Sequence, residues 1–163
     1  MPVTRAFPDA VTVVDDSEQY DLGTEWAMSA DEVASLALTS VTGPCIWRYV
    51  KISTAVVAGE VVGRDTGKAY EGTEAGAVAA VACLGAAQFA IGTGKYGWLL
   101  RNGVGLLAAA DTGGDQEDDP LATAGSGRVD PMAAGEEHQV VGFGLADAAA
   151  TAGATFQAYI SIP

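Results

Sequence analysis

An Asn-Gly pair between two apolar runs is the sequence feature that most constrains the fold of this chain. Asn102 is the only asparagine, and it stands directly before Gly103 within the stretch 95–107. A two-residue type I′ turn requires positive φ at both central positions, and Asn and Gly adopt that conformation more readily than other residues. The pattern therefore predicts an antiparallel hairpin that turns at Asn102-Gly103, and with it a β-rich C-terminal half.

Period-two alternation of side chains recurs along the chain and predicts further strands. The clearest case spans residues 45–53, where one set of alternate positions suits an inward face and the other an outward face. The remaining candidates are residues 11–14, 56–63, 139–146, 155–162 and a small hairpin at 121–132 around Gly125-Ser126-Gly127. Short strands at fairly regular spacing favour a mainly β fold, namely a small antiparallel β-barrel or sandwich.

One short helix and an extended arm are expected before these strands. Ser29 is followed three residues later by Glu32, which is the capping-box spacing, so we expect a helix over residues 30–38. Residues 1–10 hold two prolines and no periodic pattern, which indicates an extended N-terminal arm. A chain of 163 residues can bury one sizeable core, so we expect a single β-rich domain over residues 11–163.

The chain is strongly acidic, with a formal net charge of −13. Binding to phosphate groups requires clustered Lys and Arg side chains, so this charge argues against direct contact with nucleic acid or with an anionic membrane. Three explanations of the acidity stay open at this point: solubility, adaptation to a saline environment, and docking on a basic partner surface.

The cysteines and the longest uncharged stretch point to interior packing. Cys45 and Cys83 both stand in apolar surroundings and are expected to be buried free thiols, while the distance between them is not fixed by the sequence. The N-terminus lacks the apolar region of a signal peptide. Residues 75–94 are uncharged and about as long as a membrane span, but they consist largely of Ala and Gly, so we expect them to pack inside the domain.

No constellation of residues in the sequence points to catalysis. Gly92 to Gly97 match the spacing G-x-G-x-x-G, but they lead into a predicted strand rather than a helix, so nucleotide binding is not expected. The run Asp111–Asp119 offers oxygen ligands for calcium without the spacing of an EF-hand, and we expect a solvated loop there. His138, the only histidine, is expected on a surface loop. The sequence therefore predicts a protein that is not an enzyme and holds no cofactor or metal.

Several segments resemble small head proteins of tailed bacteriophages. Residues 54–62 look like a recurring step of these proteins, in which a glycine is followed by an acidic or polar residue and then by Val-Val. Residues 87–98 are similar to their Ala-Gln and Gly-(Lys/Gln)-Tyr-Gly-Trp run. Residues 139–147 and 154–162 resemble the strands that end them, so the likeness extends over residues 45–163.

The resemblance implies a capsid decoration protein, also called a cement protein. Such proteins bind the outside of an icosahedral shell and stabilise it against the pressure of the internal DNA. The resemblance implies the major capsid protein as partner, with neighbouring copies of the same chain as further contacts. It also implies a place on the capsid exterior of the virion, after synthesis in the host cytoplasm. Stabilisation then comes from simultaneous engagement of neighbouring capsomers.

The N-terminal arm is the candidate capsid contact, and Arg5, Phe7 and Val11 are the residues expected to touch the shell. An extended segment of this kind can add a strand to the edge of a capsid sheet. Two alternatives stay open: another virion or adhesion module, such as a tail- or fibre-associated binding domain, and an enzyme with carboxylates in a cleft. Copy number per particle distinguishes the first alternative, and inward-facing acids with raised pKa would indicate the second.

Overall fold

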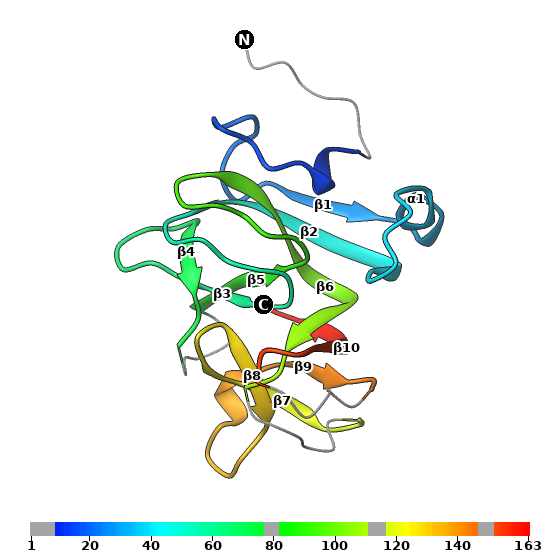
Figure 1. The fold of residues 1–163 in the computed structure, drawn as a ribbon, viewed down its shortest axis with the longest axis vertical. Helices are drawn as coiled ribbons and strands as arrows, with labels where there is room; N and C mark the ends of the chain where they lie inside the picture. Colours follow the sequence, from blue (N-terminus) through cyan, green and yellow to red (C-terminus); the bar gives the residue numbers. More distant parts are fainter. Residues whose placement is uncertain (1–8, 77–81, 111–116, 147–151) are drawn as a thin grey trace.

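The computed structural model describes residues 9–76, 82–110, 117–146 and 152–163, and it has the mainly β architecture that the sequence predicts (Figure 1). Its strands form one sheet in the order β1-β2-β4-β3-β5-β6-β10-β9-β7-β8. The strands are β1 (Glu25–Met28), β2 (Thr42–Ile52), β3 (Val61–Arg64), β4 (Glu71–Glu74), β5 (Cys83–Ala87), β6 (Tyr96–Ala108), β7 (Pro120–Gly125), β8 (Arg128–Pro131), β9 (Val140–Gly144) and β10 (Thr155–Ser161). The helical elements are η1 (Asp9–Thr12), α1 (Ala30–Ser35) and η3 (Glu137–Gln139).

An additional pairing between β2 and β6 closes part of this sheet into a ring of five strands, β2-β4-β3-β5-β6. Within the ring β2 and β4 run parallel, and the other neighbours are antiparallel. The strands β10, β9, β7 and β8 extend from β6 as an antiparallel wing, which lies below the ring in Figure 1. The expected barrel is thus present as the closed part of a larger sheet.

The predicted hairpin at Asn102-Gly103 is wrong, because β6 continues through both residues. The register between β2 and β6 shifts by one residue at Arg101, which makes a β-bulge in β6. Gly103 has a φ of +124°. A Cβ atom on Gly103 would lie 2.7 Å from the Cβ of Cys45, so this glycine permits a close approach of β2 to β6 rather than a turn.

β6 joins the ring to the wing. Its first half pairs with β2 on one side and with β5 on the other, and its second half pairs with β10. Beyond β5, the side chain of Gln88 takes the place of a neighbouring strand. Its amide oxygen accepts from the Leu106 N–H at 2.9 Å, and its amide nitrogen donates to the Leu106 carbonyl at 3.2 Å. One buried side chain thus satisfies both backbone groups of Leu106.

Two hydrophobic clusters lie on the two faces of β2. Val50 and Ile52 belong to the smaller cluster, which the ring strands share. Trp47 and Tyr49, at the alternate positions, belong to the larger cluster, which extends into the wing. Successive side chains of a strand point to opposite faces, so β2 is buried on both sides over this stretch. The outward face expected within residues 45–53 is therefore interior over residues 47–50.

The segment before β1 is fastened to the ring by specific contacts. The candidate strand at residues 11–14 is not formed, and the 3-10 turn η1 begins at Asp9, within the expected arm. Farther along, Asp15 and Tyr96 of β6 exchange two backbone hydrogen bonds of 2.8 and 3.0 Å. The Asp15 carboxylate accepts a hydrogen bond of 3.1 Å from the Tyr49 hydroxyl, and burial raises the pKa of Tyr49. The segment therefore packs against β2 and β6.

The short helix and the C-terminal strands are confirmed. α1 ends at Ser35, earlier than expected, and its capping box is formed as predicted. The Ser29 hydroxyl accepts from the Glu32 N–H at 3.3 Å, and the Glu32 carboxylate accepts from the Ser29 N–H at 2.7 Å. β7 and β8 form the predicted hairpin, in which Ser126 and Gly127 both have positive φ. The strands β1 and β4 are four residues each and were not predicted from the sequence.

Candidate functional site

The residues expected to contact a capsid are not assembled into a described site. Val11 is 1% exposed and belongs to the larger hydrophobic cluster, so its side chain is not available at the surface. Val11 was expected to contact the capsid from the surface, but it contributes to core packing instead. Arg5 and Phe7 lie outside the described residues. A role of the arm in binding therefore stays a prediction.

His138 and the acidic run Asp111–Asp119 are the residues that the sequence offers for metal binding or catalysis. His138 lies in η3 and is exposed, as expected. Most of the acidic run Asp111–Asp119 falls outside the described residues, which resume at Glu117. Within the described ranges, no group of three or more His, Cys, Asp or Glu side chains is placed to hold a metal ion.

Cys45 and Cys83 are both buried and both free, as predicted. Burial raises the pKa of the Cys45 thiol to about 11 and that of the Cys83 thiol to about 12. Such thiols stay protonated near neutral pH and are poor nucleophiles. Cys83 begins β5, whose residues are all buried, so this described part of the stretch 75–94 is packed interior. Among the described residues, none of the helices is long and apolar enough to span a membrane.

A row of uncharged side chains crosses five strands on one face of the sheet. Strand pairing places Pro120 of β7 opposite Phe143 of β9, and Phe143 opposite Tyr159 of β10. Tyr159 in turn pairs with Val104 of β6, and Val104 pairs with Thr42 of β2. Directly paired residues present their side chains on the same face of a sheet. Phe143 is 48% exposed and Tyr159 is 41% exposed, so the centre of the row is open to solvent.

A second uncharged row runs beside the first. Ser161 of β10 pairs with Asn102 of β6, Asn102 with Ile46 of β2, and Ile46 with Ala27 of β1. The Tyr159 hydroxyl joins the two rows by donating a hydrogen bond of 3.3 Å to the side-chain oxygen of Asn102. We call the residues of the two rows together the uncharged face.

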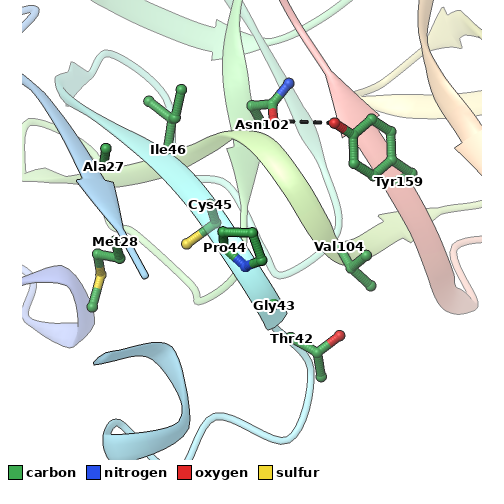
Figure 2. Close-up of a pocket in the computed structure, with 10 residues that line it drawn as sticks. All are labelled: Ala27, Met28, Thr42, Gly43, Pro44, Cys45, Ile46, Asn102, Val104 and Tyr159. Atoms are coloured by element: carbon green, nitrogen blue, oxygen red, sulfur yellow. Dashed lines mark hydrogen bonds between the residues drawn. The ribbon is translucent and has the colours of Figure 1, made fainter. Parts of the chain in front are cut away.

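An apolar groove of about 360 Å³ hollows the uncharged face between β1, β2 and β6 (Figure 2). Residues 42–46 of β2 line it, together with Met28, Val104 and Tyr159 among others. Figure 2 shows Ala27, Ile46 and Asn102 following one another across the strands toward Tyr159. A hollow of this size can take a few protruding side chains of a binding partner.

An ion cluster borders the groove on the side of the ring. The Glu25 carboxylate accepts from Arg48 Nε at 2.9 Å, from Arg48 Nη2 at 2.8 Å and from Arg101 Nη1 at 3.1 Å. Arg48 also donates to the carbonyls of Leu84 and Pro163 and is 7% exposed. Both guanidinium groups are therefore engaged within the chain.

Away from the ion cluster, acidic residues lie at two ends of the uncharged face. Asp118 and Asp119 directly precede Pro120, where the first row begins, and Asp118 is exposed. At the opposite end, Asp31 and Glu32 are exposed in the first turn of α1, which packs against β2. The face is thus apolar at its centre and acidic at these two edges.

The uncharged face is not evident from the sequence, because pairing between strands that are distant in the chain creates it. Two local signals do exist. Tyr159 stands on the solvent side of β10 among polar residues, and Phe143 stands between two glycines in β9. A large aromatic side chain at a position that alternation assigns to solvent is the pattern that indicates such a face.

Comparison with known proteins gives a fold relationship. No family model matches the chain, and no curated protein matches it. Among solved structures, the chain is similar to the crystal structure of the N base of head fiber gp8.5 of bacteriophage phi29, with a TM-score of 0.52. The two share 16% sequence identity over 71% of this chain and 92% of that chain. The chain therefore shares the fold of a bacteriophage head fiber base.

Proposed function

We propose that this chain is a virion structural protein that decorates the outside of a bacteriophage capsid and stabilises the head. The similarity of its fold to the base of a head fiber carries this proposal, because the match spans 92% of that base. The resemblance of residues 87–98 and 139–147 to tailed-phage head proteins supports the same class. The first segment runs from the end of β5 to the start of β6, and the second contains β9.

The architecture suits such a role. A decoration protein needs a stable body, a surface that adheres to the shell, and no reactive centre. The buried clusters on both faces of β2 supply the stable body. Many copies on one shell, each of which touches neighbouring capsomers, would stabilise the head through multivalent contacts. Under this proposal the major capsid protein and neighbouring copies of the chain are its partners, and the net charge of −13 disfavours direct contact with packaged DNA.

A second candidate is the base of a fiber that projects from the head. The similarity to a head fiber base favours it specifically. Both candidates place the chain on a virion without catalytic activity. They differ in what lies beyond the chain: a fiber base continues outward into further protein, and a cement protein ends at the shell.

Quantification of the chain in purified particles tests the proposal. Particles banded on a density gradient would be analysed by mass spectrometry against isotope-labelled peptides of this chain and of the shell protein. We expect the chain in tens to hundreds of copies per particle, and we expect heads without it to release DNA at a lower temperature. A few copies per particle would indicate a tail component, and absence from washed particles would contradict the proposal.

A further inference from the structure

We propose that the uncharged face is a docking surface for a protein partner whose own surface has an apolar centre and a rim of Lys and Arg side chains. The inference rests on the proposed function, under which this partner is the capsid shell.

Exposed apolar side chains gather at this place. Among the described residues the exposed large hydrophobic side chains are Val14, Val57, Phe143, Leu145 and Tyr159. Three of these five lie on or beside the uncharged face: Phe143 and Tyr159 are direct partners across β9 and β10, and Leu145 follows two residues after Phe143. Contiguous exposed apolar surface on an otherwise polar protein marks interaction sites, and aromatic anchors dominate their binding energy.

The face is rigid before any partner arrives. Phe143, Tyr159 and Val104 sit on strands that are paired along both edges, and the Tyr159 hydroxyl is held by Asn102. Side chains that are already ordered lose little conformational entropy on binding. The groove beside Tyr159 adds a hollow for protruding side chains of the partner.

The charge around the uncharged face indicates which kind of partner surface can bind there. Asp118 and Asp119 at one end and Asp31 and Glu32 at the other are acidic, and the chain as a whole carries −13. The nearby Arg48 and Arg101 are bound to Glu25. A second copy docked on this face would bring like charges together, whereas a basic rim would be complementary. The charge therefore favours a basic partner over self-association.

Binding of purified chain variants to particles that lack the chain tests the inference. The double variant Phe143→Thr/Tyr159→Thr removes both aromatic anchors and keeps residues that suit a strand. The matched control Val14→Thr/Val57→Thr removes two exposed apolar side chains away from the face. We expect the first to weaken binding about 100-fold. We expect the second to stay within about threefold of the unmodified chain, and both to melt as it does.

Two double variants, each of which removes two acidic charges, test whether the partner surface is basic. Asp118→Asn/Asp119→Asn removes two charges at the end of the face, and asparagine tolerates the positive φ of 66° at Asp118. Glu18→Gln/Asp21→Asn removes two charges near Tyr20, which packs against Tyr49 on the other face of β2. We expect the first to weaken binding about fivefold and to flatten its salt dependence, and the second to leave both unchanged.

The results of these binding experiments distinguish a wrong docking surface from a wrong function. If the unmodified chain binds particles and Phe143→Thr/Tyr159→Thr binds equally well, the docking surface lies elsewhere while the function stands. If the unmodified chain binds no particle, the proposed function fails and the inference fails with it. If light scattering shows free oligomers that dissociate in Phe143→Thr/Tyr159→Thr, the face is a contact between copies and the inference is overturned.

Discussion

Gly103 is a residue at which β6 lies close against β2. Its φ of +124° is costly for any residue with a Cβ, and the space a Cβ would need is filled by Cys45 and by the Pro44 carbonyl oxygen at 3.1 Å. Glycine is thus required at this position for two reasons: the positive φ, and the lack of space for a Cβ between the strands.

The substitution Gly103→Ala should therefore destabilise the fold strongly. We expect a loss of about 2–4 kcal/mol in the free energy of unfolding, measured by urea titration, because backbone strain and overpacking add. Gly67→Ala is the matched control: it has a φ of +75°, but nothing lies within 4 Å of the added Cβ, so it should lose only about 1 kcal/mol. Equal losses in the two variants would show that packing against Cys45 is unimportant.

Gln88 is the second residue whose side chain organises the backbone of β6. Replacement by leucine leaves the N–H and C=O of Leu106 without the amide that now bonds both. We expect Gln88→Leu to lose about 2–3 kcal/mol of stability. The control Gln157→Leu removes a single part-buried hydrogen bond to the Ser40 carbonyl. We expect this variant to lose less than about 1 kcal/mol of stability. Similar stability of Gln88→Leu and the unmodified chain would contradict this role.

The buried thiols should make the fold sensitive to alkali. The pKa of Cys45 is raised to about 11 and that of Cys83 to about 12, above the ordinary value of 9.0. A raised pKa in the folded state gives stability that is fully present below pH 9 and is lost as pH rises toward these values. We expect the melting temperature to fall between pH 8.5 and 10, with Cys83→Ala showing a shallower fall than the unmodified chain. A fall of equal slope in both would exclude the Cys83 thiol as its cause.

At the scale of elements, β6 organises the molecule, since it has strand partners on both sides and belongs to both the ring and the wing. Its backbone amides should exchange with deuterium at least about 100-fold more slowly than those of β8, which ends the sheet. Hydrogen exchange read by mass spectrometry on peptides around residues 97–107 measures this. Fast exchange at Asn102 and Gly103 would support a hairpin turn there and contradict a continuous strand.

Local patterns predict those elements that local interactions determine. The capping box at Ser29 and Glu32 fixes the start of α1, the Gly-Ser-Gly turn fixes the β7–β8 hairpin, and alternation identifies β10. The Asn102-Gly103 pair misleads because the positive φ of Gly103 serves a contact with Cys45, which is distant in sequence. Ring closure, like the placement of β1 and β4, depends on such distant pairing and has no local signature.

At the scale of the whole molecule, the uncharged face also depends on pairing between strands that are distant in the sequence. Its rows combine residues from strands between Ala27 and Ser161, so no single segment of sequence contains it. The charge of −13 by itself is compatible with solubility, salt adaptation or a basic partner. The placement of Asp118 and Asp31 at opposite ends of an apolar surface now favours the last of these.

The most direct test of this account is a cryo-EM reconstruction of the particle that carries this chain. We predict regularly repeated density for the chain on the outer surface of the shell. We further predict that the strands β6, β9 and β10 face the capsid with Phe143 and Tyr159 in the interface. A particle whose outer surface bears no density for this chain would contradict the account at its centre.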